Sequence, residues 1–334
     1  MGAGGDPVSD AGAPWVAAAA DVEVALRSRD PRARLESTLR RFEAGRIEVP
    51  SRLDAGHSAD GSVTHVMLAR DDERRLVLTK VVDYDPARPR RAGRAASAGL
   101  MTLLRDGVPL LTCSADRFTG IRTGLVAAFA IERLAPPGAL DVALVGPGLV
   151  GTETLHWLAR FRPVERVHLV GRDPARTDVV ARRLATTLEV PVEAVADVRS
   201  ATEGSSVLIT ATSTVEPIID ASDLDPDLAM IAALGAGIAE RRELSSDVVA
   251  GCQHIVVDSM RGAEEEAGDL LLAADDGVIV DHEPLGRALT TRPRPGRILY
   301  ESVGSAWQDL ACALSVLDQL RPGWDTASRQ GSQR

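Results

Sequence analysis

The stretch that decides the fold is VALVGPGLVGTETLHWLARF, residues 142–161. It begins with four apolar residues, which predict a buried strand, and it continues with apolar side chains at helical spacing. Between these segments Gly146, Gly148 and Gly151 form the pattern G-x-G-x-x-G. Glycines at this spacing allow a tight turn, close approach of a pyrophosphate to the backbone, and close packing of the helix on the strand. The stretch therefore predicts a dinucleotide-binding Rossmann unit, with the phosphates at the helix N-terminus.

The surroundings of the glycines decide between a nucleotide site and a turn that binds no nucleotide. A second apolar strand follows at the distance expected of a βαβ unit. Apolar runs alternate with amphipathic helices over residues 142–145, 167–170, 207–210, 230–234 and 255–257. This alternation predicts a parallel sheet covered by helices. We favour the nucleotide site, and we assign to it Leu149 and Val150 from the helix start and Thr212 from the end of the third strand.

The residues after the second strand discriminate between the two nicotinamide cofactors. An NAD enzyme usually has an acidic residue there for the ribose hydroxyls, whereas an NADP enzyme needs positive charge for the 2′-phosphate. Here Gly171 is followed by Arg172, with Arg176 one turn further along, and a guanidinium can bind phosphate through two hydrogen bonds. Asp173 is the counterargument, but it can instead cap the next helix. The sequence favours NADP(H), with NAD(H) as the alternative.

The first part of the chain has the pattern of an α+β domain. Residues 20–42 have helical spacing, and short apolar runs between residues 63 and 78 predict antiparallel strands. Two further strands, at residues 98–104 and 108–113, flank Asp106-Gly107, which is a favoured hairpin turn. We therefore expect an α/β protein in which an α+β domain precedes the Rossmann domain.

Pro136-Pro137-Gly138 marks the expected boundary between the two domains. The α+β domain is predicted at residues 1–135, with a frayed N-terminal tail, and the Rossmann domain at residues 138–300. A last helix, residues 306–320 within the segment 304–322, is expected to pack back on the first domain. Residues 323–334 are expected to be a disordered tail.

The composition limits the class of ligand. A net charge of −10 and an aromatic content of 3% disfavour a nucleic-acid partner. No uncharged apolar stretch approaches the roughly 20 residues that cross a bilayer, and the N-terminus lacks the cationic start of a secretion signal. Cys113, Cys252 and Cys312 offer neither a disulfide framework nor metal-ligand spacing. We therefore expect a cytoplasmic protein that binds a small molecule and no metal, nucleic acid or membrane.

Several separated segments resemble the ornithine cyclodeaminase and μ-crystallin superfamily in order and spacing, over about residues 49–320. The segments are Pro50-Ser51-Arg52, Thr79-Lys80-Val81-Val82, Thr119-Gly120-Ile121-Arg122-Thr123-Gly124, the glycine loop, Glu243-Leu244, and Ser302-Val303-Gly304-Ser305-Ala306-Trp307-Gln308-Asp309. The resemblance implies that the N-terminal domain binds the substrate and forms the interface of a homodimer. A dimer would also cover the exposed edges of short strands.

The resemblance implies roles for three cations. Arg52 and Arg122 would bind the carboxylate of an amino or imino acid, and Lys80 would be a proton donor or a carboxylate ligand. Physics supplies a reason for such a cluster, because three cations brought together by the fold repel one another unless an anion joins them. The alternative is that all three are ordinary surface cations, since arginine is abundant in this chain.

The chain departs from the cyclodeaminase pattern at two acids. Gly237 occupies the position of an aspartate that assists proton removal in sequences resembling true cyclodeaminases, and glycine cannot do so. The family's glutamate aligns with His65, and a nearby proline is replaced by Leu68. His65 is either a titrating group that faces the substrate or a strand residue on a solvated face. The missing acids disfavour ring closure with ammonia loss, whereas the reduction performed by μ-crystallin-like ketimine reductases remains possible.

We therefore expect an NADPH-dependent reductase of a small imine that bears a carboxylate, or the reverse amino-acid dehydrogenase. The candidate catalytic residues are Lys80, Arg52, Arg122 and His65. The cofactor would supply the hydride, and the protein would supply orientation and charge complementarity. One alternative is a cyclodeaminase or related amino-acid synthase that uses His65 or another acid. The other is a non-catalytic NADP(H)-binding protein.

Overall fold

The chain divides between residues 119 and 120 and between residues 305 and 306. In the computed structural model, the residues described are 15–56, 62–85, 87–88, 92, 96–235, 237–290 and 295–324. Unit 1 comprises residues 1–119 and 306–334, and unit 2 comprises residues 120–305.

The first boundary lies in the first turn of helix α4 (Phe118–Leu134) rather than at Pro136-Pro137-Gly138. Two glycines of α4 explain why this helix belongs with unit 2. A Cβ atom at Gly120 would collide with the side chain of Leu149, and one at Gly124 would lie 2.6 Å from the backbone nitrogen of Thr154. Helix α4 therefore packs closely on the helix that follows the glycine loop.

Unit 1 is an α+β unit with a six-stranded sheet in the order β1-β6-β5-β4-β3-β2. Strand β1 is parallel to β6, and the other neighbours are antiparallel. The strands are β1 (Trp15–Ala17), β2 (Leu53–Ala55), β3 (Val63–Asp71), β4 (Leu76–Tyr84), β5 (Ser97–Arg105) and β6 (Val108–Ser114). The helices are α1 (Ala19–Ser28), α2 (Arg32–Glu43) and α12 (Ala306–Leu320).

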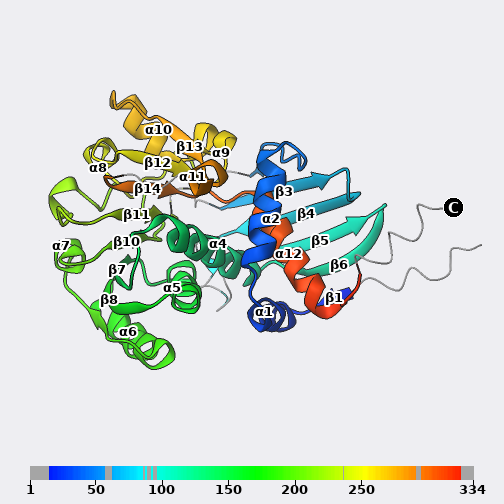
Figure 1. Ribbon diagram of the computed structural model, residues 1–334, viewed down its shortest axis with the longest axis horizontal. Coiled ribbons are helices and arrows are strands. Elements are labelled where there is room, and N and C mark those ends of the chain that lie inside the picture. The colour runs from blue at the N-terminus through cyan, green and yellow to red at the C-terminus, as the bar shows by residue number, and fades with distance from the viewer. Residues whose placement is uncertain are drawn as a thin grey trace, which may run out of the picture. The chain divides into compact units, whose positions relative to one another are not determined.

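Local sequence patterns explain much of unit 1. Asp106 and Gly107 have φ values of 54° and 79° and connect β5 to β6, as the hairpin prediction required. The last helix has the predicted bounds, and Figure 1 shows it (orange-red) beside α2 (blue). There Phe42 stacks on Trp307 with ring centroids 6.1 Å apart.

Two predictions about the tails need correction. Residues 15–17, which we placed in the frayed N-terminal tail, form β1 beside β6; residues 1–14 lie outside the described residues. Trp324, placed in the disordered C-terminal tail, donates its indole hydrogen bond to Asp318 Oδ1 at 2.8 Å and lies under the Arg105 guanidinium. Residues 325–334 again lie outside the described residues.

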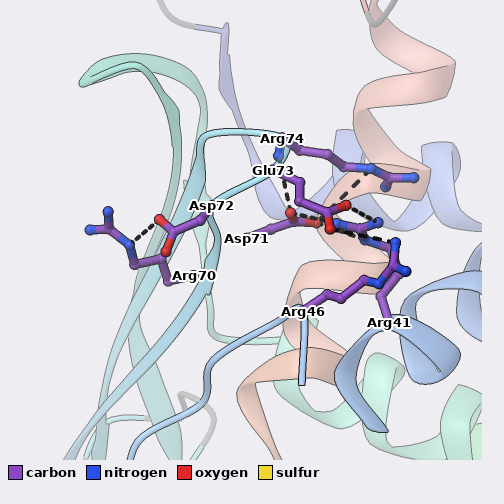
Figure 2. A network of polar contacts seen from close by, with 7 residues as sticks. All are labelled: Arg41, Arg46, Arg70, Asp71, Asp72, Glu73 and Arg74. Atoms are coloured by element: carbon purple, nitrogen blue, oxygen red, sulfur yellow. Dashed lines mark hydrogen bonds and ion pairs between the residues drawn. The ribbon is translucent and has the colours of Figure 1, made fainter. Parts of the chain in front are cut away.

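A network of charged residues ties the β3–β4 turn to α2 (Figure 2). Arg41 of α2 donates to both carboxylate oxygens of Asp71, at 3.0 and 2.7 Å, and also to Glu73. The Asp71 side chain is only 1% exposed. The hydrogen bond to Asp71 is the largest effect on Arg41 and raises the pKa of its guanidinium. This paired geometry fixes the turn against the helix.

Unit 2 is a Rossmann-like α/β unit with an eight-stranded sheet in the order β13-β12-β14-β11-β10-β7-β8-β9, in which all neighbours are parallel. The strands are β7 (Leu140–Val145), β8 (Val164–Val170), β9 (Val192–Ala194), β10 (Val207–Thr210), β11 (Met230–Ala233), β12 (His254–Val257), β13 (His282–Pro284) and β14 (Ile298–Glu301). The helices of this unit, in addition to α4, are α5 (Leu149–Phe161), α6 (Pro174–Leu188), α7 (Val198–Thr202), η1 (Ala221–Asp223), α8 (Ser246–Ala250), α9 (Met260–Glu265), α10 (Gly268–Asp275) and α11 (Leu285–Thr290).

The five strands predicted for this unit are all present, and the alternation of strands and helices continues beyond the last of them. Strand β14 enters the middle of the sheet, between β11 and β12. It has only four residues, and the helix before it, α11, has six. Elements this short carry too little periodicity to be recognised from sequence. Unit 2 consequently ends at Ser305 and not at residue 300.

Candidate active site

The three glycines of the nucleotide loop have the three geometries that their predicted tasks require. Gly146 has a φ of 90°, and a Cβ there would lie 2.6 Å from the Ala211 carbonyl oxygen. A Cβ at Gly151 would lie 2.7 Å from the Gly146 carbonyl oxygen. Gly148 caps the N-terminus of α5 without a side-chain cap, and a Cβ there would meet nothing within 4 Å. The open side of the loop is therefore the side on which a pyrophosphate could approach, so the residues present fit a dinucleotide.

Two arginines follow β8, and the acid between them caps a helix. Asp173 caps α6 and accepts a hydrogen bond from the Arg176 backbone nitrogen at 3.2 Å. Its capping role, which was one of two interpretations, accounts for the acid at this position. Arg172 and Arg176 are both exposed, and within the described chain no ion pair or hydrogen bond engages the Arg172 guanidinium.

A buried carboxylate holds the loop that contains Thr212. Glu243 accepts hydrogen bonds from the Thr210 hydroxyl, from the Thr212 backbone and hydroxyl, and from the Gly235 backbone, at 2.6–2.8 Å. Burial raises the pKa of Glu243, while the hydrogen bonds from Thr212 oppose that shift. The Thr212 hydroxyl thus donates to Glu243, and its oxygen can still accept a hydrogen bond from a ligand.

Two more buried acids lie in the same unit. The Glu301 side chain is 1% exposed, and neither of its carboxylate oxygens has a hydrogen-bond partner among the described residues. Burial raises the pKa of Glu301 well above its ordinary value. Burial, with the nearby Glu243 charge, raises the pKa of Asp269 to about 7. These acids are therefore expected to retain protons at a pH where exposed carboxyls have lost them.

Lys80 lies in unit 1 and is fully engaged with an acid that we had assigned no role. Its ammonium is 2.7–2.8 Å from the two carboxylate oxygens of Asp309 on α12, with side chains 1% and 0% exposed. Strand register places Lys80 on the sheet face that also carries Met67 and Met101. Lys80 is therefore not a surface cation, and Asp309 supplies an anion that pairs with its charge.

Arg52, Asp54 and His65 form a second polar group in unit 1. The Asp54 Oδ1 atom lies 3.0 Å from Arg52 Nε and 2.6 Å from His65 Nδ1. The His65 side chain is 14% exposed, so the alternative of a solvated strand face does not hold. Burial lowers the pKa of His65, the Arg52 and Lys80 charges lower it further, and Asp54 opposes the shift. The structure thus brings Arg52, His65 and Lys80 onto one part of unit 1.

Arg122 belongs to unit 2, where it is 4% exposed and lies against a glycine. A Cβ at Gly304, which has a φ of 86°, would lie 3.0 Å from a guanidinium nitrogen of Arg122. Asp258 holds this loop by accepting hydrogen bonds from the Ser302 hydroxyl at 2.7 Å and from the Gly304 backbone at 2.9 Å. Only glycine combines this backbone conformation with the close approach of the guanidinium.

Comparison with known proteins identifies the family of this chain. Residues 13–323 match the family described as "Ornithine cyclodeaminase/mu-crystallin family". The chain belongs to this family. Delta(1)-pyrroline-2-carboxylate/Delta(1)-piperideine-2-carboxylate reductase of Azospirillum brasilense is 30% identical over 293 residues, which cover 84% of this chain and 87% of that protein. Ketimine reductase mu-crystallin of Mus musculus is 29% identical over 224 residues, covering 65% and 67%.

A solved structure supports the fold. Thermococcus litoralis Delta(1)-pyrroline-2-carboxylate reductase, in complex with NADH and L-proline, superposes with a TM-score of 0.84 at 23% identity, over 91% of this chain and 96% of that one. The predictions of the family, of the α/β fold class and of an NAD(P)-dependent oxidoreductase acting on C–N bonds are confirmed. No helix in the described parts of this family member is long and apolar enough to cross a membrane.

The sequence interpretation of this family member missed the acids that accompany the cations. Asp309 is the last residue of the segment from Ser302 to Asp309, and Asp54 lies two residues after Arg52. The sequence pattern assigned no role to either acid. The spacing of Arg52 and Asp54 on one short segment could have signalled a pair. Nothing in the local sequence points to Asp309, which is 229 positions from Lys80.

Proposed function

We propose that this protein uses NADPH to reduce a small cyclic imine that bears a carboxylate on the carbon of its C=N bond. The observation that carries the proposal is the group Arg52–Asp54–His65 beside the Lys80–Asp309 pair, on one face of the sheet of unit 1. Buried ionic groups add little net stability, so their presence favours a binding or catalytic role. The reductases among the relatives suggest pyrroline-2-carboxylate and piperideine-2-carboxylate as substrates.

The residues of the chain bind and orient the substrate, and the nicotinamide, when bound, supplies the hydride. Arg52 and Arg122 would bind the substrate carboxylate, because a guanidinium can engage both oxygens of such a group. Lys80 holds a proton at Nζ and is itself positioned by Asp309 at 2.7 Å. We propose this ammonium as the proton donor, or as a further carboxylate ligand, and a substrate held in this way needs little reorganisation before it reacts.

Gly237 favours reduction over cyclodeamination. A Cβ at this position would lie 3.1 Å from the Val303 carbonyl oxygen. The acidic side chain of an aspartate there would therefore begin close to another electronegative oxygen. The glycine leaves no carboxylate to remove a proton or activate a side-chain amine. We therefore expect ornithine and lysine not to be converted to cyclic amino acids with release of ammonia.

We further propose NADPH rather than NADH as the preferred cofactor, on the evidence of Arg172 and Arg176. A cytoplasmic location is supported by the three cysteines, all of which are free.

A homodimer through unit 1 is supported by a row of apolar residues across four strands, Leu53, Val66, Val81 and Leu100. Leu53, Val81 and Leu100 are 64%, 44% and 52% exposed, and a second subunit would cover them.

The deciding experiment follows loss of NADPH absorbance with each of the two cyclic imino acids. Turnover is expected, and Arg122→Ala should lower kcat/KM by an amount equivalent to about 2 to 5 kcal/mol. Arg133→Ala is the matched control, since Arg133 lies on the same helix and pairs with Glu132 near the surface. Ammonia release from ornithine or lysine with NAD at a comparable rate would overturn the proposal. Tight NADPH binding without turnover of any imine would favour a non-catalytic role.

A further inference from the structure

We propose that Asp54 is a positioning residue, which holds His65 in the tautomer whose Nε2 atom accepts a hydrogen bond from the reacting nitrogen of the substrate. The inference rests on the proposed function and extends it by naming the group that faces that nitrogen. It assigns His65 a task distinct from those of Arg52 and Lys80, which can only donate hydrogen bonds.

Geometry determines the tautomer. Asp54 Oδ1 lies 2.6 Å from His65 Nδ1 and also forms an ion pair with Arg52 Nε at 3.0 Å. A carboxylate that pairs with a guanidinium can only accept hydrogen bonds, so the hydrogen between Asp54 and His65 is on Nδ1. The neutral ring then has its lone pair on Nε2. No residue of the described chain forms a hydrogen bond with that atom.

The surroundings keep the ring neutral. Burial is the largest effect, and Arg52 and Lys80 add positive charge, which together lower the pKa of His65 despite Asp54. The charged groups that face the ring are Arg52 and Asp54 from the β2 segment and Lys80 from β4, and Lys80 is in turn paired with Asp309 from α12. At neutral pH the imidazole is therefore an acceptor and not a cation.

Strand register places His65 where it can serve the same substrate as Lys80. Asp54 is opposite His65, and Met67, two residues further along β3, is opposite Lys80. Because alternate residues of a strand point to the same face, the side chains of Asp54, His65 and Lys80 share one face of the sheet. A carboxylate held by the cations therefore brings the adjacent imine nitrogen near His65.

The chemistry needs such an acceptor in both directions. In reduction, the N–H of the protonated imine would donate to Nε2 while the carbon receives the hydride that bound NADPH would supply. The nitrogen would keep its proton as the C=N double bond becomes a single bond. In oxidation, an ammonium N–H bond would break and its proton would pass to Nε2 and on to solvent. The carbon of the neutral amine would then give up a hydride to bound NADP⁺ as the C=N bond forms. Protonated His65 could do neither and would repel the iminium cation.

The test combines a pH profile with a measurement that needs no turnover. In reduction of pyrroline-2-carboxylate, kcat/KM of the wild type should fall at acidic pH as His65 gains a proton. His65→Leu should lower kcat/KM by roughly 10²-fold and abolish this acidic limb. Asp54→Asn should lower kcat by about ten-fold and move the limb to lower pH, because Asp54 raises the pKa of His65, and Asp54→Glu should restore part of the rate.

Asp83→Asn is the matched control, since Asp83 lies on β4, bonds to Thr64 and is 56% exposed. It should leave the profile unchanged. Nitrogen-15 NMR of the ring, assigned with His65→Leu, should show hydrogen on Nδ1 in the wild type and a changed tautomer population in Asp54→Asn. Hydrogen on Nε2 in the wild type, or an acidic limb that persists in His65→Leu, would overturn the inference. If no imine is turned over, the proposed function fails, and NMR still decides the role of Asp54.

Discussion

The ion pair between Lys80 and Asp309 offers a quantitative test of the structure of unit 1. Both side chains are almost fully buried, and the ammonium lies 2.7 Å from the carboxylate. Lys80→Met keeps the length of the side chain but leaves a buried, unpaired acid. Removal of one partner from a buried pair typically costs 3 to 5 kcal/mol, so we expect a loss of about 4 kcal/mol in the free energy of unfolding.

Urea unfolding followed by tryptophan fluorescence, to which Trp307 contributes from the core of unit 1, measures this loss. The midpoint should fall by roughly 1 to 2 M for Lys80→Met. The double variant Lys80→Met/Asp309→Leu should recover most of the stability, because no uncompensated charge remains. A single variant within about 0.5 kcal/mol of the wild type would refute the buried pair. The pair would also be refuted if the double variant lost as much stability as the two single variants together, because the effects of substitutions at residues in contact should not add.

Three further predictions concern the cofactor, pH and assembly. Arg172→Ala should weaken NADPH binding by about 1 to 3 kcal/mol and leave NADH binding nearly unchanged; equal losses in calorimetric titrations with both would contradict the cofactor assignment. Burial raises the pKa of Asp269 from 3.8 to about 7, so between these pH values the folded protein binds more protons than the unfolded chain. The contribution of Asp269 to the free energy of unfolding is therefore fully present below pH 4. It is lost, by about 4 kcal/mol at most, as the pH rises through 7. Asp269→Asn should flatten this dependence in thermal unfolding, and an unchanged slope would count against it. Val81→Asp should convert a dimer to a monomer in light scattering, whereas a wild type already monomeric would remove the basis for the proposed interface.

Features that depend on neighbours along the chain could be predicted from the amino-acid sequence. The spacing of Gly146, Gly148 and Gly151 predicted the nucleotide loop, because strand, turn and helix are contiguous. Asp106-Gly107 predicted its hairpin since few other residues tolerate two successive positive φ values. The cap formed by Asp173 was also accessible, because it involves a backbone nitrogen only three residues away.

Which charged side chains pair with one another depends on how distant segments pack. Asp309 pairs with Lys80 across 229 positions, and Asp54 with His65 through a strand register that no local pattern specifies. The place of β14 between β11 and β12 likewise depends on the order of strands in the sheet. Local patterns encode periodicity and turn chemistry, whereas contacts between distant segments arise only once the elements pack. The acids that tune the candidate site are contacts of this second kind.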